Sequence, residues 1–210
     1  MKTLLQLNSS LFSNAGQSSR LAADFVAEWK ASNTNGQVIT RDLAADPIPH
    51  LTAERFQSFL AKPEARTVAQ QKVVTESDAL IAELQQADTI VIGLPMYNFG
   101  LPSTLKAYFD HVARAGVTFR YTEKGPEGLL KGKKVYVFAT RGGLYAGTPL
   151  DTQTAYVRDF LRFLGIDDVE FVYAEGLAMG EPKRDAALAQ AQAAIRAIAQ
   201  RSREALAAAA

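Results

Sequence analysis

The sequence predicts an α/β protein in which helices cover both faces of a five-stranded parallel sheet, giving three layers. Short apolar runs alternate with amphipathic stretches along the chain. The clearest run, Ile90-Val91-Ile92-Gly93-Leu94, is unbroken and rich in β-branched residues, as in a strand buried on both faces. Five such runs, with a single polar loop of the anion-binding type after the first, favour the strand order 2-1-3-4-5 over a six-stranded dinucleotide fold.

The predicted strands are residues 3–7, 37–41, 90–94, 134–140 and 169–174. After the first strand, Leu21, Phe25, Val26 and Trp29 share one face of a helix that ends before residues 33–36. Further helices are predicted over residues 52–86 with a break at 62–63, from 102 to about 116, from about 151 to 164, and from about 184 to 206, with fraying at 207–210. Residues 117–121 alternate like a strand, and residues 123–128 have turn chemistry. Because no linker or repeat interrupts this pattern, we expect one domain over residues 1–210.

Composition and charge exclude several classes of function. The 23 Lys and Arg residues nearly balance the 22 Asp and Glu residues, whereas nucleic acid or an anionic membrane requires a basic surplus on one face. The chain has no Cys, which excludes disulfides, zinc thiolate sites and iron–sulfur clusters. Any redox chemistry must therefore be carried by a cofactor.

The first residues superficially resemble a signal peptide. However, Gln6, Asn8 and Ser9 interrupt the apolar run, so it does not reach the length that such a peptide requires. No window approaches the roughly 18 apolar residues of a membrane-spanning helix. We therefore expect a soluble, cytoplasmic protein.

Three loops follow the carboxyl ends of the first, third and fourth strands, which are neighbours in the predicted order. The first loop, residues 9–19, brings Ser10, Gln17, Ser18 and Ser19 to the start of a helix, where free N–H groups and the helix dipole favour an anion. The alternative is that these serines only form the turn and cap the helix. No Lys lies in this loop, so an anion would be met by dipoles and hydroxyl groups.

The second loop contains Met96, Tyr97, Asn98 and Phe99, which together offer flat apolar surface and one amide. Taken alone, such a loop more often serves packing than cofactor binding. The third loop, residues 140–143 (TRGG), allows close backbone approach through its glycines while Arg141 brings a cation, or it is a plain turn with a solvated Arg. Together the three loops indicate a site for a mononucleotide with a flat ring at one sheet edge.

Other chemistries do not fit the spacing of the residues. No G-x-G-x-x-G follows the first strand, residues 128–134 lack the Ser or Thr of a P-loop, and residues 16–20 are not a nucleophile elbow. The two histidines, His50 and His111, lie on separate elements, which argues against a metal site or a Ser–His pair. We interpret both as surface or interface residues.

Several segments together resemble one enzyme family. They are residues 41–49 (RDLAADPIP), 95–99 (PMYNF), 113–122 (ARAGVTFRYT), 125–128 (GPEG) and 141–143 (RGG). In combination they closely resemble the FMN-dependent NADH-azoreductases, a branch of the flavodoxin-like NAD(P)H:quinone oxidoreductases. The resemblance runs from Met1 to about Glu181.

This resemblance implies a flavodoxin-like homodimer with one FMN per subunit near the interface. It places the flavin phosphate and ring against these residues: Ser10, Gly16, Gln17 and Ser18 for the phosphate; Met96, Tyr97, Asn98, Phe99, Thr140, Arg141, Gly142 and Gly143 for the ring. Phe99, Tyr121 and Phe163 would form aromatic walls and a lid around the substrate, and Tyr145 would lie beside it. Similar enzymes run a ping-pong reaction in which NADH or NADPH gives a hydride to flavin N5 and the flavin passes it to a quinone or azo compound. No side chain needs to act as catalytic acid or base.

The chain departs from its relatives at four positions. Gly16 stands where many carry Ser, Thr140 replaces a common Ser, Tyr145 stands where they often carry His, and Leu60 where some carry an Arg thought to help the nicotinamide nucleotide. These departures bear on substrate range and on the preference for NADH or NADPH.

Two other functions remain open from the sequence. A non-catalytic flavodoxin-like electron carrier is the main alternative, although such carriers tend to be strongly acidic and this chain is nearly neutral. A cofactor-free regulatory domain would be colourless.

Overall fold

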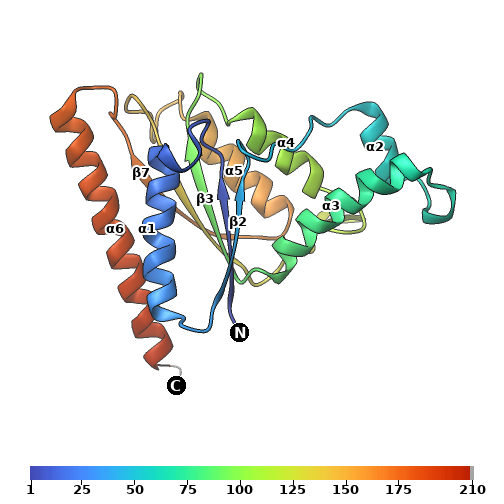
Figure 1. The fold of residues 1–210 in the computed structure, drawn as a ribbon, viewed down its shortest axis with the longest axis horizontal. Helices are drawn as coiled ribbons and strands as arrows, with labels where there is room; N and C mark the ends of the chain where they lie inside the picture. The colour runs from blue at the N-terminus through green and yellow to red at the C-terminus, as the bar shows by residue number, and fades with distance from the viewer. Residues whose placement is uncertain (209–210) are drawn as a thin grey trace.

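A computed structural model describes residues 1–208 and contains a five-stranded parallel sheet. In spatial order its strands are β2 (Gln37–Asp42), β1 (Thr3–Asn8), β3 (Thr89–Pro95), β6 (Lys134–Thr140) and β7 (Asp168–Ala174). The predicted order 2-1-3-4-5 is confirmed, with β6 and β7 as its fourth and fifth strands. The sheet runs through the middle of the molecule in Figure 1.

Helices cover both faces of the sheet, as Figure 1 shows. One face carries α1 (Gln17–Ser32) and α6 (Glu181–Ala208), and the other carries α3 (Val68–Gln86), α4 (Ser103–Val112) and α5 (Thr152–Phe163). Two 3₁₀ turns, η1 (Ser13–Ala15) and η2 (Pro63–Ala65), and the short helix α2 (Ala53–Leu60) complete this part of the chain. The predicted break at 62–63 is confirmed, because Pro63 begins η2 and a new capping box at Thr67 begins α3.

The alternation of side chains along the strands builds two cores. Leu4 of β1 and Val91 of β3 pack under α1 and α6, whereas Leu5 and Ile92 pack under the helices of the other face. Every residue of β1 is buried, as expected for a strand with a neighbour on each side and helices on both faces. The edge strand β2 is partly exposed along its length.

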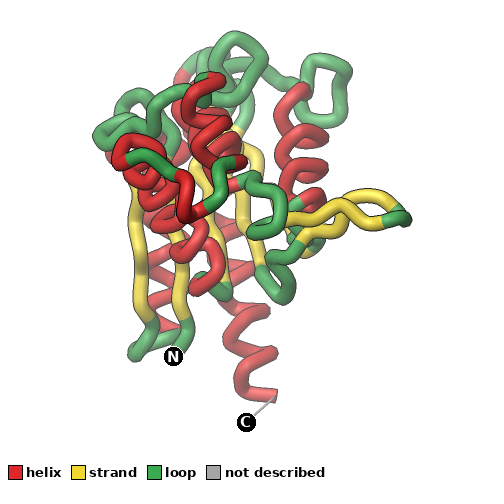
Figure 2. Tube along the Cα trace, turned by 90° about the vertical axis from the view of Figure 1, so that its right-hand side faces the viewer, coloured by secondary structure: helices red, strands yellow, loops and turns green. Residues whose placement is uncertain are grey.

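A β-hairpin leaves the body of the molecule between α4 and β6, and it projects sideways in Figure 2. Its strands are β4 (Phe119–Thr122) and β5 (Gly125–Gly128), so only the beginning of the segment predicted as turn is a turn. Residues 125–128 instead pair with β4. The last of them, Gly128, has no side chain, which allows its backbone to lie directly against that of Gly165 after α5. The helix predicted to end near Gly116 ends at Val112, where the hydroxyl of Thr118 donates to the Val112 carbonyl at 2.6 Å as the chain turns toward the hairpin.

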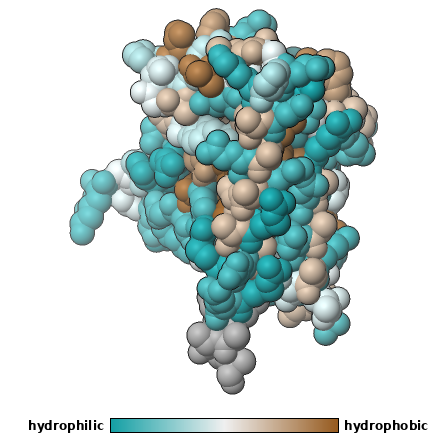
Figure 3. Space-filling model, turned by 90° about the vertical axis from the view of Figure 1, so that its left-hand side faces the viewer, coloured by the Kyte–Doolittle hydropathy of each residue, from teal (hydrophilic) through white to brown (hydrophobic). Residues whose placement is uncertain are grey.

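The side of the molecule formed by α6 and α1 is mostly hydrophilic (Figure 3). The last helix continues to Ala208, and residues 209–210, the end of the segment predicted to fray, lie outside the described part. Among the helices described, none is both long and apolar enough to cross a bilayer.

The strand order places a ligand-binding edge between β1 and β3. From β1 the chain crosses to β2 on one side, and the following crossover enters β3 on the other side. The loops after β1 and β3 therefore diverge at their carboxyl ends and leave a crevice, which is the usual ligand position in open α/β sheets.

Candidate functional site

The three loops predicted to form a site do meet at the carboxyl edge of the sheet. The hydroxyl of Ser10 lies 3.3 Å from the hydroxyl of Tyr97, and the amide of Leu11 donates to that same Tyr97 oxygen at 3.2 Å. The amide of Met96 donates to the carbonyl of Thr140 at 2.9 Å. The second loop is thus joined to both the first and the third.

The first loop ends in a helix start without a side-chain cap. Helix α1 is capped by Gly16, and its first-turn serines, Ser18 and Ser19, are buried with hydroxyl groups that have no hydrogen-bond partner. The interpretation of the serines as N-cap residues is therefore wrong for this helix. Buried hydroxyls beside free N–H groups at a helix N-terminus are suited to an anion, which would supply the missing partners.

The space around position 16 leaves no room for a side chain. A Cβ at this position would lie 2.0 Å from the Ser10 hydroxyl oxygen, so a Ser here would force Ser10 to move. The Ser10 hydroxyl therefore occupies the space that a side chain at position 16 would take.

The second loop is a tight turn that holds two residues in a left-handed conformation. The amides and carbonyls of Tyr97 and Gly100 bond to each other at 3.2 and 2.9 Å, and the backbone φ is 49° at Asn98 and 61° at Phe99. This is the pattern of a type I′ turn, in which Gly is the preferred second central residue and Phe is unfavourable. Such strain costs about 1–3 kcal/mol and is found mainly at functional sites.

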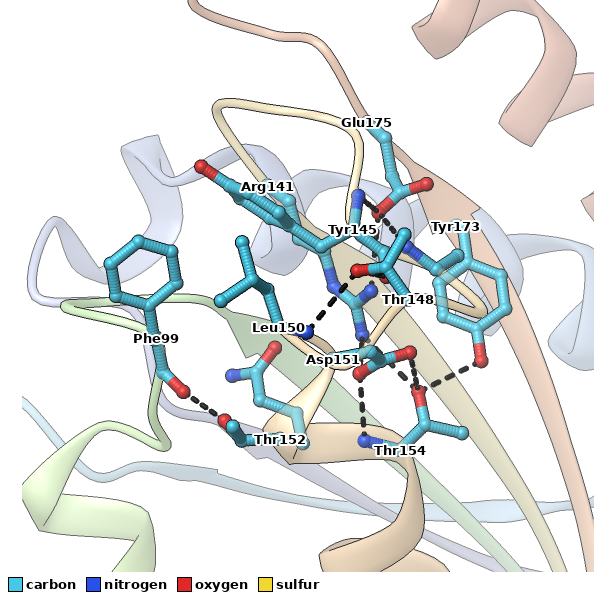
Figure 4. Close-up of polar contacts among 12 residues, drawn as sticks. Phe99, Arg141, Tyr145, Thr148, Leu150, Asp151, Thr152, Thr154, Tyr173 and Glu175 are labelled. Carbon is cyan, nitrogen blue, oxygen red and sulfur yellow. Dashed lines mark hydrogen bonds and ion pairs between the residues drawn. The ribbon is translucent and has the colours of Figure 1, made fainter.

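The consequence of the turn is an aromatic ring held at the edge of the sheet. Phe99 is 50% exposed and meets Tyr145 of the third loop edge-on, with ring centroids 5.5 Å apart. Both rings come from loops at the same edge, as Figure 4 shows. The turn and the third loop together form an apolar wall, and Asn98 in the turn is exposed.

Arg141 of the third loop points into the protein. Its side chain is 0% exposed and pairs with Asp151 at 2.7 Å and Glu175 at 3.1 Å, with the Tyr173 ring 5.0 Å from its guanidinium carbon. The interpretation as a solvated Arg is therefore wrong. Its charge is matched by two carboxylates, and in this loop Gly142 is exposed and Gly143 partly exposed.

Asp151 and Glu175 are residues of the candidate site that sequence reasoning missed, and they fix the position of Arg141. Burial by itself raises the pKa of Asp151, but hydrogen bonds from Arg141 and Thr154 outweigh it and hold that pKa below its usual value. Glu175 accepts the amides of Tyr145 and Ala146, both at 2.8 Å (Figure 4). The position of Glu175 directly after the last strand could have indicated a role at this edge.

Similarity to known proteins agrees with this geometry. Residues 1–199 match a family described as having a flavodoxin-like fold. The FMN-dependent NADH:quinone oxidoreductase of Cellvibrio japonicus is 58% identical over 192 residues, which cover 91% of this chain and 96% of the relative. The chain belongs to this flavodoxin-like family of FMN-dependent NADH:quinone oxidoreductases. The family predicted from the sequence is confirmed.

Other members of the family extend the comparison. The FMN-dependent NADH:quinone oxidoreductase 6 of Burkholderia lata is 56% identical over 195 residues, 93% of this chain and 98% of that protein. Among solved structures, an FMN-dependent NADH-azoreductase of Bacillus anthracis in complex with FMN superimposes with a TM-score of 0.87 at 27% identity, over 96% of this chain and 99% of that one.

The family resemblance assigned four aromatic residues to the substrate, but within one chain Tyr121 and Phe163 lie apart from Phe99 and Tyr145. Phe163 ends α5, whereas Phe99 is bonded to Thr152 at the beginning of that helix, about 16 Å away at 1.5 Å per residue. Tyr121 is 75% exposed on the hairpin, where it and Phe163 both contact Phe119. The four residues therefore form two separate pairs, Phe99 with Tyr145 and Tyr121 with Phe163.

Exposed apolar side chains lie around the candidate site at the carboxyl edge. Large side chains that stay exposed occur in the loops that follow β1, β3, β6 and β7; they are Leu11, Phe12, Phe99, Leu144, Leu150 and Met179. Exposed apolar groups gathered at one edge usually mark a binding surface. This rim suits a flat apolar ring better than a highly charged ligand.

His111 is not the surface residue that the sequence suggested. It is fully buried, and its ring hydrogen bonds with the carbonyl of Ala107 at 2.8 Å and with Nε of Arg55 at 3.0 Å. Because Arg55 can only donate, His111 Nε2 accepts and the proton lies on Nδ1. Burial lowers the pKa of His111, and the charge of Arg55 adds to this effect. His50 is exposed, as expected.

Proposed function

We propose that this chain binds FMN at the carboxyl edge of its sheet and uses it to reduce quinones and azo compounds with NADH or NADPH. The observation that carries the proposal is that the strained Tyr97–Gly100 turn, whose Tyr97 hydroxyl lies 3.3 Å from that of Ser10, shares the carboxyl edge of the sheet with the unpartnered serines of α1. The names of the relatives support the choice of cofactor, donor and acceptor. The chain is then an oxidoreductase.

The residues present fit the cofactor. Ser10, Gly16, Gln17 and Ser18 would hold the phosphate, because buried hydroxyls without partners and a helix N-terminus without a side-chain cap are found there. The ring would lie between the turn residues 96–99 and residues 140–143, where a glycine pair permits close approach of the backbone.

Bound FMN would supply two-electron hydride chemistry at N5, in a ping-pong sequence in which the nicotinamide leaves before the acceptor binds. The side chains of this protein orient and shield the reactants. Phe99 and Tyr145 present flat apolar faces and exclude water on one side. Gly142 and Gly143 keep the approach of a flat acceptor open, and a permissive wall of this kind accepts both quinones and azo compounds.

The two separate aromatic pairs support a homodimer. Tyr121 and Phe163 lie too far from Phe99 to close over the same ligand in one chain. Tyr121 is exposed on the hairpin that projects from the body (Figure 2), and Phe163, at the end of α5, contacts the first residue of that hairpin, Phe119, so a second copy placed on this side would meet both residues. Each site would then combine Phe99 and Tyr145 of one copy with the corresponding Tyr121 and Phe163 of the other. The cytoplasmic location stays a prediction from the sequence.

A spectrum of the purified protein tests the proposal. We expect a yellow protein, or one that FMN turns yellow, whose visible absorption bleaches with NADH and returns on addition of a quinone. A colourless protein that FMN cannot reconstitute would refute the flavin site. A yellow protein that neither NADH nor NADPH bleaches would identify a non-catalytic electron carrier instead.

Asn98→Gly tests the side-chain amide of Asn98 apart from the backbone conformation of the turn. Glycine keeps the left-handed conformation that Asn98 adopts, whereas alanine would strain it. We therefore expect this variant to fold normally and to bind FMN more weakly or to be reduced more slowly. Unchanged FMN affinity and turnover would show that the Asn98 amide has no part in the site.

A further inference from the structure

Gln153 joins the two ends of the turn that carries Phe99. It lies in the first turn of α5 and is fully buried. Its Nε2 donates to the carbonyl of Pro95 at 2.9 Å and to the carbonyl of Gly100 at 3.0 Å. Since both partners are carbonyls that can only accept, the nitrogen of the amide must face them, and both of its hydrogens are used.

The two carbonyls lie on either side of the strained residues. Pro95 ends β3, and Gly100 closes the turn through its bonds with Tyr97. Between them, Asn98 and Phe99 keep positive φ values that a non-glycine residue leaves readily when nothing holds it. A buried donor that bridges both ends restrains the separation of those ends, and with it the left-handed conformation between them.

The neighbouring residue adds to the same restraint. The hydroxyl of Thr152 donates to the carbonyl of Phe99 itself (Figure 4). One residue further back, Asp151 holds Arg141 of the third loop. The first turn of α5 thus contacts both loops that form the apolar wall, and Gln153 is its buried contact with the second loop.

We propose that Gln153 is a positioning residue, which holds the Phe99 turn in its strained conformation so that the ring faces the flavin. The inference rests on the proposed FMN site. Gln153 touches neither cofactor nor substrate in this arrangement, and it acts through the backbone of residues 95–100. Its own oxygen Oε1 is buried without a partner, so the side chain serves here through its two donors alone.

Gln153→Met is the first test, because methionine has a similar length, suits a helix and cannot donate. We expect the dissociation constant of FMN, measured on the full-length chain by quenching of flavin fluorescence, to rise about tenfold or more, since two buried carbonyls lose their partner. Gln190→Met on the exposed side of α6 is the matched control and should bind FMN like the parent. Equal FMN affinity in Gln153→Met and the parent would overturn the proposal.

Phe99→Gly distinguishes positioning from simple stabilisation. Glycine adopts the left-handed conformation without strain, so the turn no longer depends on the restraint. Gln153→Met should then weaken FMN binding by less than about threefold in the Phe99→Gly background, compared with about tenfold in the parent. The same factor in both backgrounds would show that Gln153 does not act through the turn.

Gln153→Glu keeps the proposal testable where the methionine variant folds poorly. Ionised, this glutamate repels the two carbonyls, and protonated it can donate to one of them. Its FMN affinity should therefore recover part of the loss as the pH is lowered, by a larger factor than that of the parent. Absence of this recovery contradicts the proposal, whereas failure of the parent itself to bind FMN would refute the flavin site and not the role of Gln153.

Discussion

Arg141→Met removes the cation from between two carboxylates that the fold keeps away from water. The side chains of Asp151 and Glu175 are 7% and 15% exposed, and Arg141 is 0% exposed between them. Removing one partner of a buried ion pair costs about 3–5 kcal/mol, because the remaining charge stays desolvated. Each carboxylate keeps donors of its own, Thr154 for Asp151 and the amides of Tyr145 and Ala146 for Glu175. We therefore expect the lower end, about 3 kcal/mol.

Urea unfolding of the apoprotein measures this loss directly. With a denaturant slope of about 2 kcal/mol per molar, 3 kcal/mol lowers the unfolding midpoint by about 1.5 M. FMN is omitted so that ligand binding does not mask the change. Arg162→Met is the control: this Arg is 61% exposed and pairs with Asp159 on the surface, so its loss should change stability by no more than about 0.5 kcal/mol.

The pH dependence provides a second check on the same ion pair. In the parent the pKa of Asp151 is lowered, so its contribution to stability is present above the usual carboxyl pKa of 3.8 and is lost as the pH falls through the lowered value. Without Arg141, burial raises that pKa with only Thr154 to offset it. The stability gap between parent and variant should therefore narrow as the pH is lowered from 7 toward 4. A midpoint change below about 0.5 M, or a gap that does not depend on pH, would refute the reasoning.

Three further changes test the fold around the site. Gly128→Ala should cost about 3 kcal/mol in urea unfolding, because its Cβ would lie 2.0 Å from the backbone nitrogen of Gly165, where no side chain can yield. Since burial lowers the pKa of His111, the unfolded chain takes up the proton first, and stability should fall as the pH decreases from about 6.5; His111→Gln should reduce this slope and His50→Gln should not, as unfolding midpoints across pH will show. Thr67→Ala should cost about 1 kcal/mol by removing the capping box of α3, and an unchanged melting temperature would contradict that role.

Much of the architecture was predictable because its signals are local. The unbroken apolar run at residues 90–94 predicts a strand buried on both faces, and that segment is the centre of β3. The strand order follows from the number of such runs and the position of the polar loop. The meeting of the three loops then follows, because the carboxyl ends of neighbouring parallel strands share one edge.

The hairpin shows where local signals mislead. Residues 125–128 have the composition of a turn, yet they form β5 because β4 supplies hydrogen-bond partners and Gly165 accepts the close approach of Gly128. His111 is polar and lies between polar and apolar neighbours on a helix, yet Arg55 and Ala107 satisfy its ring in the core. In both cases the hydrogen-bond partners that the fold supplies decide the structure around the residue.

The sequence by itself determined the α/β class, the strand order, the family and the set of loops that form the candidate site. The tertiary structure alone decided how the side chains in that site are used. Arg141 faces inward because Glu175, 34 residues away, lies beside it, and the Phe99 turn is held by Gln153, whose partner Pro95 is 58 residues away. Apolar periodicity is a property of residues close together in the sequence, whereas the partner of a buried donor or charge depends on which distant segments the fold brings together.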